Sequence, residues 1–395
     1  MSSGRLILIV LLQIFCTNPK QNRTIHREYF YVGGEYSYDE NLRERVMNGQ
    51  IYVEHLSLNS IEQQAYPLVF IHGAGTTGTN WLNTPDGREG WATYFVKQGY
   101  EVYLIDQPAR GRSPLSPNLN LTLRSFTTER VEKQFTATDV YQLWPQASLH
   151  TQWPGDNKTT KGQMGDAVFD AFYASTVQYV ADKKSRQTSL QKAGAALLDK
   201  IGPAVLVAHS QGATPNWLIA DVRPQLVKGI VAIEPTGPPF RDQVFSNKST
   251  RSWGLTDIFL TYDPPVNSSS DLLIEEIPST NLNLSSCILQ KEPARKLVHL
   301  LNIPILIEIG QASYHAVYDH CTAEFLLQAG ANVELIRLEN IGIYGNGHML
   351  MLEKNNLEIA EVIHQWLQKN IFLPYANAQS NTSDIFDSFI SEKKQ

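Results

Sequence analysis

The chain has 395 residues, of which 42% are hydrophobic and 18% are charged, and its formal net charge at pH 7 is −6. This length accommodates one large domain with insertions, and the apolar share excludes a chain that is disordered throughout. The acidic balance and the lack of a basic run in the sequence argue against nucleic acid as a partner.

The first segment, residues 1–17, has the pattern of a secretory signal peptide. Arg5 precedes an apolar run from Leu6 to Cys16, and only Gln13 interrupts that run. The run is shorter than the roughly 20 apolar residues that span a bilayer. We therefore predict that residues 24–395 form a secreted, extracellular domain without stable membrane insertion, with an uncleaved anchor as the alternative.

Two further patterns fit an extracellular protein. Cys287 and Cys321 are the cysteines that remain after Cys16 of the signal segment, and we expect them to form one disulfide. Two separate buried thiols are the alternative. Seven N-x-[S/T] sequons also predict surface asparagines that accept glycans. They are Asn22, Asn120, Asn157, Asn247, Asn267, Asn283 and Asn381.

Short apolar runs bounded by turn residues predict buried parallel strands. Alternating stretches before them predict an antiparallel edge at 28–32 and 50–54. Helical spacing lies between several of the runs, so the chain predicts a doubly wound, mostly parallel α/β sheet. The predicted buried strands are 67–71, 100–105, 204–208, 229–233, 303–309 and 333–338. The predicted helices are 91–98, 167–184, 189–201, 315–329 and 357–369.

Two connections are too long for simple crossovers. About a hundred residues separate Ile105 from Ala204, and about seventy separate Ile233 from Ile303. Ligands of open α/β sheets bind at the carboxyl ends of the strands. We therefore predict cap or lid insertions over that edge, at about 113–165 and 237–296.

The segment around Ser210 gives the strongest chemical signal. The apolar run 204–208 leads into Ala208-His-Ser-Gln-Gly212, and helical spacing follows over 213–222. A nucleophile elbow needs this order, with small residues on both sides of the serine so that strand and helix can approach. Ala208 replaces the usual first glycine by one methyl group. We predict Ser210 as a nucleophile, with an ordinary serine in a strand–helix turn as the alternative.

A glycine-rich turn, His72-Gly-Ala-Gly75, directly follows the predicted strand 67–71. Acyl transfer needs backbone N–H groups aimed at the developing oxyanion. Such a turn can supply one of these groups, and the residue after the nucleophile can supply the other. We predict an oxyanion hole formed by the N–H groups of Ala74 and Gln211.

The same turn matches a dinucleotide-binding pattern. Gly73-Ala-Gly-Thr-Thr-Gly78 fits G-x-G-x-x-G, and Asp106 ends a later strand. That motif needs a helix opening at the glycines, whereas Asn83-Thr-Pro-Asp-Gly87 interrupts the chain almost at once. Asp106 also lies farther along than the roughly 20 residues that the motif requires. We therefore expect no nucleotide cofactor.

The general base should be a histidine on a late loop. His348 follows the predicted strand 333–338, in Gly345-Asn-Gly-His-Met349, and a helix comes after it. A histidine at this place can reach a serine across the edge of the sheet. We predict His348 as the base.

The other histidines near these motifs have different interpretations. His209 lies inside the elbow and should face away from the serine, and His72 should fix the oxyanion loop. His315 and His320 are five residues apart, which is poor spacing for a shared metal. We interpret those two as surface or helix-packing residues and expect no metal.

The acid that orients the base usually follows the strand after the cap, here 303–309, but no carboxylate occupies that turn. Glu234 instead ends the preceding strand, 229–233. A carboxylate at the end of an apolar strand is unfavourable unless it is paired. We predict Glu234 as the acid, with Asp319 as the second candidate and a purely structural Glu234 as the third reading.

These residues together resemble the α/β-hydrolase superfamily from about residue 67 to residue 367. The resemblance rests on His72-Gly, the segment from Tyr100 to Ser113, the serine elbow and Gly347-His348. The segment Thr84-Pro-Asp-Gly-Arg-Glu-Gly-Trp91, leading into Asp106-Gln-Pro-Ala-Arg-Gly-Arg112, is similar to a branch of exported microbial serine esterases.

In that branch the acid is a glutamate after the sixth strand. The resemblance thus implies a triad of Ser210, His348 and Glu234. This chain departs from the family pattern at Ala208 and in the missing acid after the seventh strand, and the second departure bears on the identity of the acid.

These observations predict a secreted serine hydrolase that cleaves a small-molecule carboxylic ester through an acyl-enzyme, without a cofactor. A lactonase, an amidase or a peptidase on the same triad is one alternative, because a fold does not set the bond that is cleaved. A catalytically silent binding protein on the same scaffold is another. The sequence carries no signal for the natural substrate or the oligomeric state.

Overall fold

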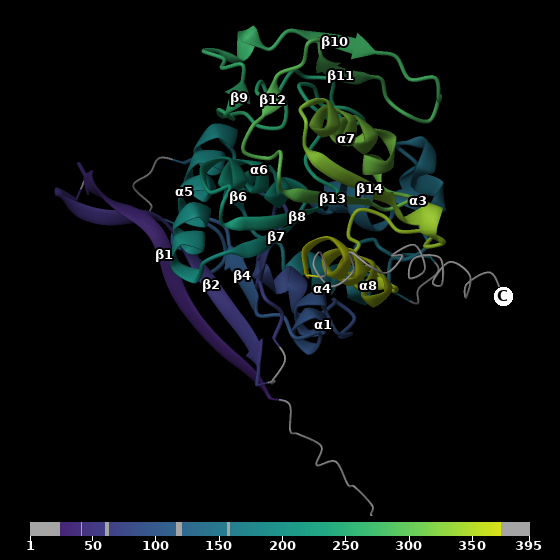
Figure 1. Cartoon of the computed structure of the whole chain (residues 1–395). Coiled ribbons are helices and arrows are strands. Elements are labelled where there is room, and N and C mark those ends of the chain that lie inside the picture. Colours follow the sequence, from purple (N-terminus) through teal and green to yellow (C-terminus); the bar gives the residue numbers. More distant parts are fainter. Residues whose placement is uncertain (1–23, 41, 60–62, 116–120, 156–158, 373–395) are drawn as a thin grey trace, which may run out of the picture.

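The computed structural model describes residues 24–40, 42–59, 63–115, 121–155 and 159–372. Figure 1 shows a central twisted sheet with helices on both faces. Eight strands form this sheet in the order β1–β2–β4–β3–β7–β8–β13–β14. β1 and β2, and β2 and β4, pair antiparallel, and the other neighbours pair parallel. The predicted doubly wound, mostly parallel α/β sheet is thereby confirmed.

The strands of the sheet fall where apolar runs or alternating stretches occur in the sequence. Their bounds are β1 (Ile25–Asp39), β2 (Glu44–Leu58), β3 (Leu68–Ile71), β4 (Val102–Asp106), β7 (Ala204–His209), β8 (Val227–Ile233), β13 (Pro304–Ile309) and β14 (Asn332–Arg337). β3, β4 and β7 are buried along their whole length, as expected for central strands covered on both faces. The antiparallel edge is longer than its alternating stretches suggested, because β1 and β2 each run for 15 residues. Their far ends project from the body of the molecule (Figure 1).

Helices cover the two faces of the sheet in two groups. α5 (Lys183–Ile201), α6 (Ala213–Val222) and α7 (Asp319–Gln328) pack in one apolar core. α1 (Trp91–Lys97) and α8 (Asn356–Leu367) pack in the other. None of the helices in the described ranges is long and apolar enough to cross a membrane.

The predicted helix 167–184 is wrong as a single element. α4 (Ala167–Ala174) ends early, and the short strand β6 (Tyr179–Val180) comes before α5 begins. The hydroxyls of Ser175 and Thr176 donate to the carbonyls of Phe172 and Tyr173, each at 2.7 Å. Such side-chain bonds compete with the helical backbone, which apolar spacing alone does not reveal.

The two long connections fold over the carboxyl end of the sheet. The first contains β5 (Leu123–Arg124), α2 (Thr128–Val131), α3 (Thr138–Tyr141), α4 and β6 before α5. The second contains β9 (Tyr262–Asp263), β10 (Ile274–Ile277), β11 (Cys287–Gln290) and β12 (Lys296–Leu297). Short single turns complete the fold at Gly78–Trp81, Glu132–Thr136, Pro145–Leu149, Ser210–Gly212, Ser269–Asp271, Tyr314–Val317, Leu338–Ile341 and Gln368–Phe372. The insertion limits 113–165 and 237–296 stay predictions.

A disulfide joins Cys287 on β11 to Cys321 on α7, with a sulfur–sulfur distance of 2.03 Å. It ties the second connection to a helix of the main body. The side chains of three sequon asparagines, Asn247, Asn267 and Asn283, lie exposed. The predicted signal segment 1–17 lies outside the described residues, as do the sequons Asn22, Asn120, Asn157 and Asn381.

Candidate active site

Ser210 occupies a sharp turn between β7 and α6. Its φ of 54° lies in the left-handed region, which a non-glycine residue adopts only under strain that the surrounding structure supports. A Cβ atom on Gly212 would lie 2.5 Å from the carbonyl oxygen of His72 and 2.6 Å from that of Ile71. Glycine is therefore required there for strand and helix to approach. This is the geometry of a nucleophile elbow.

His348 lies on the loop after β14 and is nearly inaccessible to solvent. Its Nδ1 atom lies 2.5 Å from Oε2 of Glu234. The backbone of the loop is held by His209, whose Nε2 atom donates to the carbonyl of His348 at 2.9 Å. His209 thus helps to place His348.

Glu234 follows β8 at the carboxyl end of the sheet and is completely buried. Its carboxylate accepts hydrogen bonds from the N–H of Gly310 at 2.8 Å and from Oγ of Ser313 at 2.6 Å. A Cβ atom on Gly310 would lie 2.7 Å from the carbonyl oxygen of Asn346, so glycine lets the histidine loop pass close to this strand end. Three donors therefore converge on one carboxylate.

Burial shifts the pKa values of Glu234 and His348 in opposite directions. It raises the pKa of Glu234, while nearby His315, Ser313 and Gly310 act to lower that pKa. Burial, together with His209 and His315, holds the pKa of His348 well below 6.5. Because Gly310, Ser313 and His348 all donate to Glu234, the geometry favours the ionised carboxylate and a neutral His348 that donates from Nδ1. Nε2 of His348 then carries no proton and can accept one.

Asp319, the second candidate for the acid, contacts a different histidine. Its Oδ2 atom lies 2.8 Å from Nδ1 of His315. Both side chains are buried. The structure therefore brings Glu234, and not Asp319, to the base.

Sequence reasoning missed two residues around His348. The ring of His315, interpreted as a surface or helix-packing residue, lies parallel to the ring of His348 with centroids 4.8 Å apart. The hydroxyl of Tyr314 lies 3.3 Å from Nε2 of His348. One signal was present: both residues follow Ser313 in the turn after β13, where family members usually place the acid.

The predicted oxyanion donors, Ala74 and Gln211, line the same cavity as Ser210 and His348. The carbonyl of Gly73 belongs to the same planar peptide as the N–H of Ala74, so fixing one direction fixes the other. Three donors hold that carbonyl: Nδ1 of His72 at 2.9 Å, Nη1 of Arg110 at 2.9 Å and Oγ1 of Thr76 at 3.2 Å.

His72 and Arg110 support this loop in complementary ways. Nε2 of His72 accepts from the N–H of Gln107 at 3.1 Å, which leaves its proton on Nδ1 for Gly73. Burial lowers the pKa of His72 to about 3, so the ring is neutral. Arg110 also donates through Nη2 to the side-chain oxygen of Gln211. One guanidinium group therefore contacts both the Gly73 carbonyl, which precedes the Ala74 N–H, and the side chain of Gln211.

The dinucleotide alternative does not fit the structure. The glycine-rich turn leads into the single turn Gly78–Trp81 and not into a long helix. The carboxylate of Asp106 accepts from the N–H of Gly78 at 2.8 Å and from Nε of Arg112 at 2.8 Å. Asp106 is thus engaged in the fold and unavailable to a ribose.

Two groups of side chains have potential ligand atoms within 4.8 Å of one another. The first consists of Cys287, His320 and Cys321, and its two sulfur atoms are bonded to each other. The second consists of Glu234, His315 and His348, whose atoms hydrogen-bond to one another or to Asp319. The sulfur atoms of the first group and the carboxylate and Nδ1 atoms of the second are thus already engaged within the protein.

A cavity of about 180 Å³ opens in front of Ser210. Its walls carry aromatic side chains from both long connections and from the turn after β13, together with polar groups from the sheet edge. The aromatic residues are Phe126, Phe135, Phe172, Phe245 and Tyr314. The cavity therefore offers an apolar surface next to Ser210, His348 and the predicted backbone donors.

Comparison with known proteins agrees with this geometry. The profile of the alpha/beta hydrolase family matches residues 68–362. A probable secreted lipase, phiG, of Fungal sp. (strain ATCC 74256) is 48% identical over 342 residues, which are 86% of this chain and 89% of the relative. The solved structure of a novel bacterial esterase superposes with a TM-score of 0.60 at 22% identity, covering 89% of this chain and 98% of that one. The chain belongs to the alpha/beta hydrolase family.

Proposed function

We propose that this protein is a secreted serine esterase that acts through Ser210, His348 and Glu234. The observation that carries the proposal is the 2.5 Å contact between Nδ1 of His348 and Glu234, in a cavity that Ser210 and His348 both line. The fungal relative is named a probable secreted lipase, which supports both ester cleavage and export. The exposed sequons at Asn247, Asn267 and Asn283 are the glycosylation sites that we propose on the described surface.

The chemistry follows from the positions of these groups. His348 takes the proton of the Ser210 hydroxyl through Nε2, and the serine oxygen attacks the ester carbonyl. The N–H groups of Ala74 and Gln211 stabilise the negative charge on the carbonyl oxygen. Glu234 stabilises the positive charge that the imidazole gains. His348 returns the proton to the leaving alcohol, and water releases the acid from Ser210 by the same steps.

A direct test combines active-site labelling with ester hydrolysis. A fluorophosphonate probe should label the purified protein, and Ser210→Ala should lose both labelling and hydrolysis of 4-nitrophenyl esters. In known triads such a loss is about 10⁶-fold in kcat. Unlabelled wild-type protein would contradict the proposal and favour a binding protein. Faster turnover of lactones or anilides than of matched esters would reassign the bond that is cleaved.

A further inference from the structure

A second cavity, of about 140 Å³, adjoins the one in front of Ser210. Gln211 and Thr236 line both cavities, so the two share a wall directly beside the nucleophile. The charged residues around the second cavity are Lys183, Arg186, Arg251, Asp242 and Asp257. The sequence does not show this grouping, because its residues lie on α5 and on the connection after β8, which are distant along the chain.

The two carboxylates of this wall already have partners. Asp242 forms an ion pair with Nη1 of Arg251 at 2.8 Å. Asp257 accepts from the N–H of Arg251 at 3.0 Å and from Nε2 of Gln187 at 2.7 Å. Arg251 itself is 2% exposed and carries one positive charge against these two carboxylates, so Lys183 and Arg186 supply the remaining cations around the cavity.

Two guanidinium groups here lack a carboxylate partner among the described residues. Arg186 donates to the carbonyl of Val180 at 2.6 Å. Burial lowers the pKa of Arg186, and the charges of Asp257 and Asp182 act to raise it without a direct ion pair among the described residues. Arg110, behind Gln211, is 2% exposed and donates to the neutral oxygens of Gly73 and Gln211. Burial and the charge of Arg186 lower the pKa of Arg110 to about 9, so the two cations repel each other. Such buried charges are unfavourable unless something offsets them.

The first turn of α5 adds to the excess positive charge. Lys183, Lys184 and Arg186 lie in this turn or next to it, and the turn contains no acidic residue. Positive side chains are unfavourable at a helix N-terminus, where the helix dipole is itself positive. The cap residue Asp182 accepts from the N–H of Ser185 at 2.7 Å and forms no ion pair with Arg186 among the described residues. An anion in the cavity would offset this charge.

We infer that the second cavity is a subsite for a carboxylate group of the substrate, held by Arg186 and Lys183. The inference rests on the proposed function, because it places the subsite one side chain away from the attacking Ser210. It narrows the substrate class to esters that carry a free carboxylate, such as monoesters of dicarboxylic acids. The protein supplies the cations of this subsite, and the substrate carboxylate binds to them. The aromatic cavity in front of Ser210 takes the uncharged part of the substrate.

A matched pair of esters tests the inference. Mono-4-nitrophenyl glutarate and 4-nitrophenyl pentanoate have acyl chains of equal length and differ in the terminal carboxylate. We expect kcat/KM to favour the glutarate ester, and Arg186→Gln to reduce the ratio of the two kcat/KM values by roughly tenfold to a hundredfold, the range for one hydrogen bond to a charged group. Rising salt should reduce the same ratio in the wild type.

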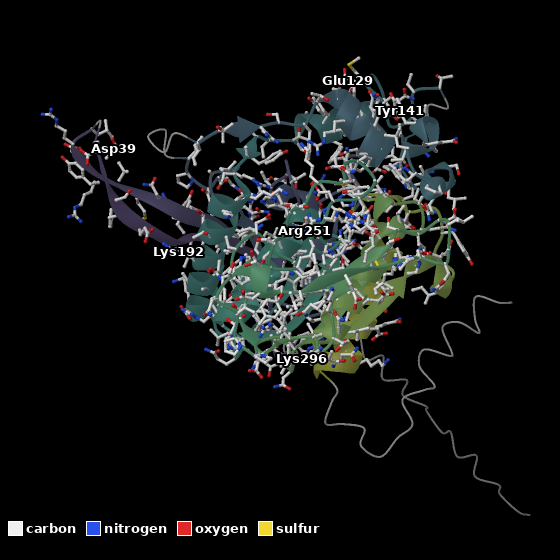
Figure 2. The ribbon with its side chains drawn as sticks, turned by 90° about the horizontal axis from the view of Figure 1, so that it is seen from above. Asp39, Glu129, Tyr141, Lys192, Arg251 and Lys296 are labelled. Atoms are coloured by element: carbon white, nitrogen blue, oxygen red, sulfur yellow. A yellow bond between two sulfur atoms is a disulfide. The ribbon has the colours of Figure 1, made fainter. Side chains whose placement is uncertain are left out.

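Lys192→Gln is the matched control. Lys192 lies on the same helix but pairs with Glu35 of β1 at 3.0 Å, and Figure 2 shows it toward the projecting hairpin, away from Arg251. This variant should keep the wild-type ratio. A wild-type ratio near one, or an Arg186→Gln ratio equal to that of the wild type, would overturn the inference.

A binding measurement separates this inference from the proposed function. Ser210→Ala protein should bind glutarate in calorimetry, and the double variant with Arg186→Gln should not. If the wild type resists fluorophosphonate and cleaves no ester, the proposed function fails while glutarate binding still reports on the subsite. If esters are cleaved but glutarate binds neither protein, the subsite fails alone.

Discussion

The rings of His315 and His348 lie parallel, with an interplanar angle of 2° and centroids 4.8 Å apart. The stack places a second titratable imidazole against the base of the site. Any positive charge on His315 disfavours protonation of His348, and burial acts in the same direction. The pair is therefore expected to set the pH below which activity falls.

The pH dependence follows from these shifts. A base with a lowered pKa stays neutral to lower pH, so kcat/KM should fall only as the pH drops well below 6.5, the ordinary value for histidine. Burial lowers the pKa of His315 to about 4, so its ring becomes positive only in the acid range. There His315→Gln removes a charge that opposes protonation of His348, and it should move this acid limb to higher pH. The measurement is a kcat/KM profile for both proteins. An acid limb at or above pH 6.5 in the wild type would contradict the assignment.

Glu234→Gln tests the identity of the acid. The amide cannot stabilise the imidazolium and favours the wrong tautomer of His348, so kcat should fall by about 10⁴-fold, as in other triads. Asp319→Asn is the control, because Asp319 contacts His315 and not His348. It should retain kcat within about tenfold, since it removes no direct partner of the base. The reverse order of losses would make Asp319 the acid.

Arg110→Met tests the support of the oxyanion hole. Loss of the bonds to Gly73 and Gln211 should let the predicted donors shift, which weakens contacts made only in the transition state. We expect kcat to fall by about 10- to 100-fold, as for other supporting contacts, with little change in KM. Arg223→Gln removes a cation from an exposed pair with Asp199 and should leave kinetics unchanged. Unaltered kcat in folded Arg110→Met would exclude this role.

The disulfide is expected to stabilise the fold without entering the chemistry. Cys287 and Cys321 are 34 positions apart, and closing such a loop stabilises by about 4 kcal/mol through the entropy of the unfolded chain. The double variant with serine at both positions should lower the free energy of unfolding by about this amount. Chemical denaturation measures the change, and kcat at a temperature well below the transition should match the wild type. A stability equal to that of the wild type would contradict the expectation.

The sequence by itself determined the local parts of the site. A buried strand, a serine between small residues and a helix occur in consecutive order, so the elbow at Ser210 is readable without any tertiary contact. The same holds for the glycine-rich turn before Ala74 and for His348 after the last strand. Each is a strand followed by a turn, and hydrophobic pattern and turn residues encode that order directly.

Tertiary structure decided which of these parts meet. Glu234 reaches His348 because β8 lies beside β13, and strand order is not written in the periodicity of either strand. His315, Arg110 and Arg186 come to the site from segments whose local patterns suggest only helices or loops. Contacts across the carboxyl edge of a parallel sheet depend on the packing of distant segments. For this reason the sequence indicated the elbow at Ser210, and only the fold placed its neighbours.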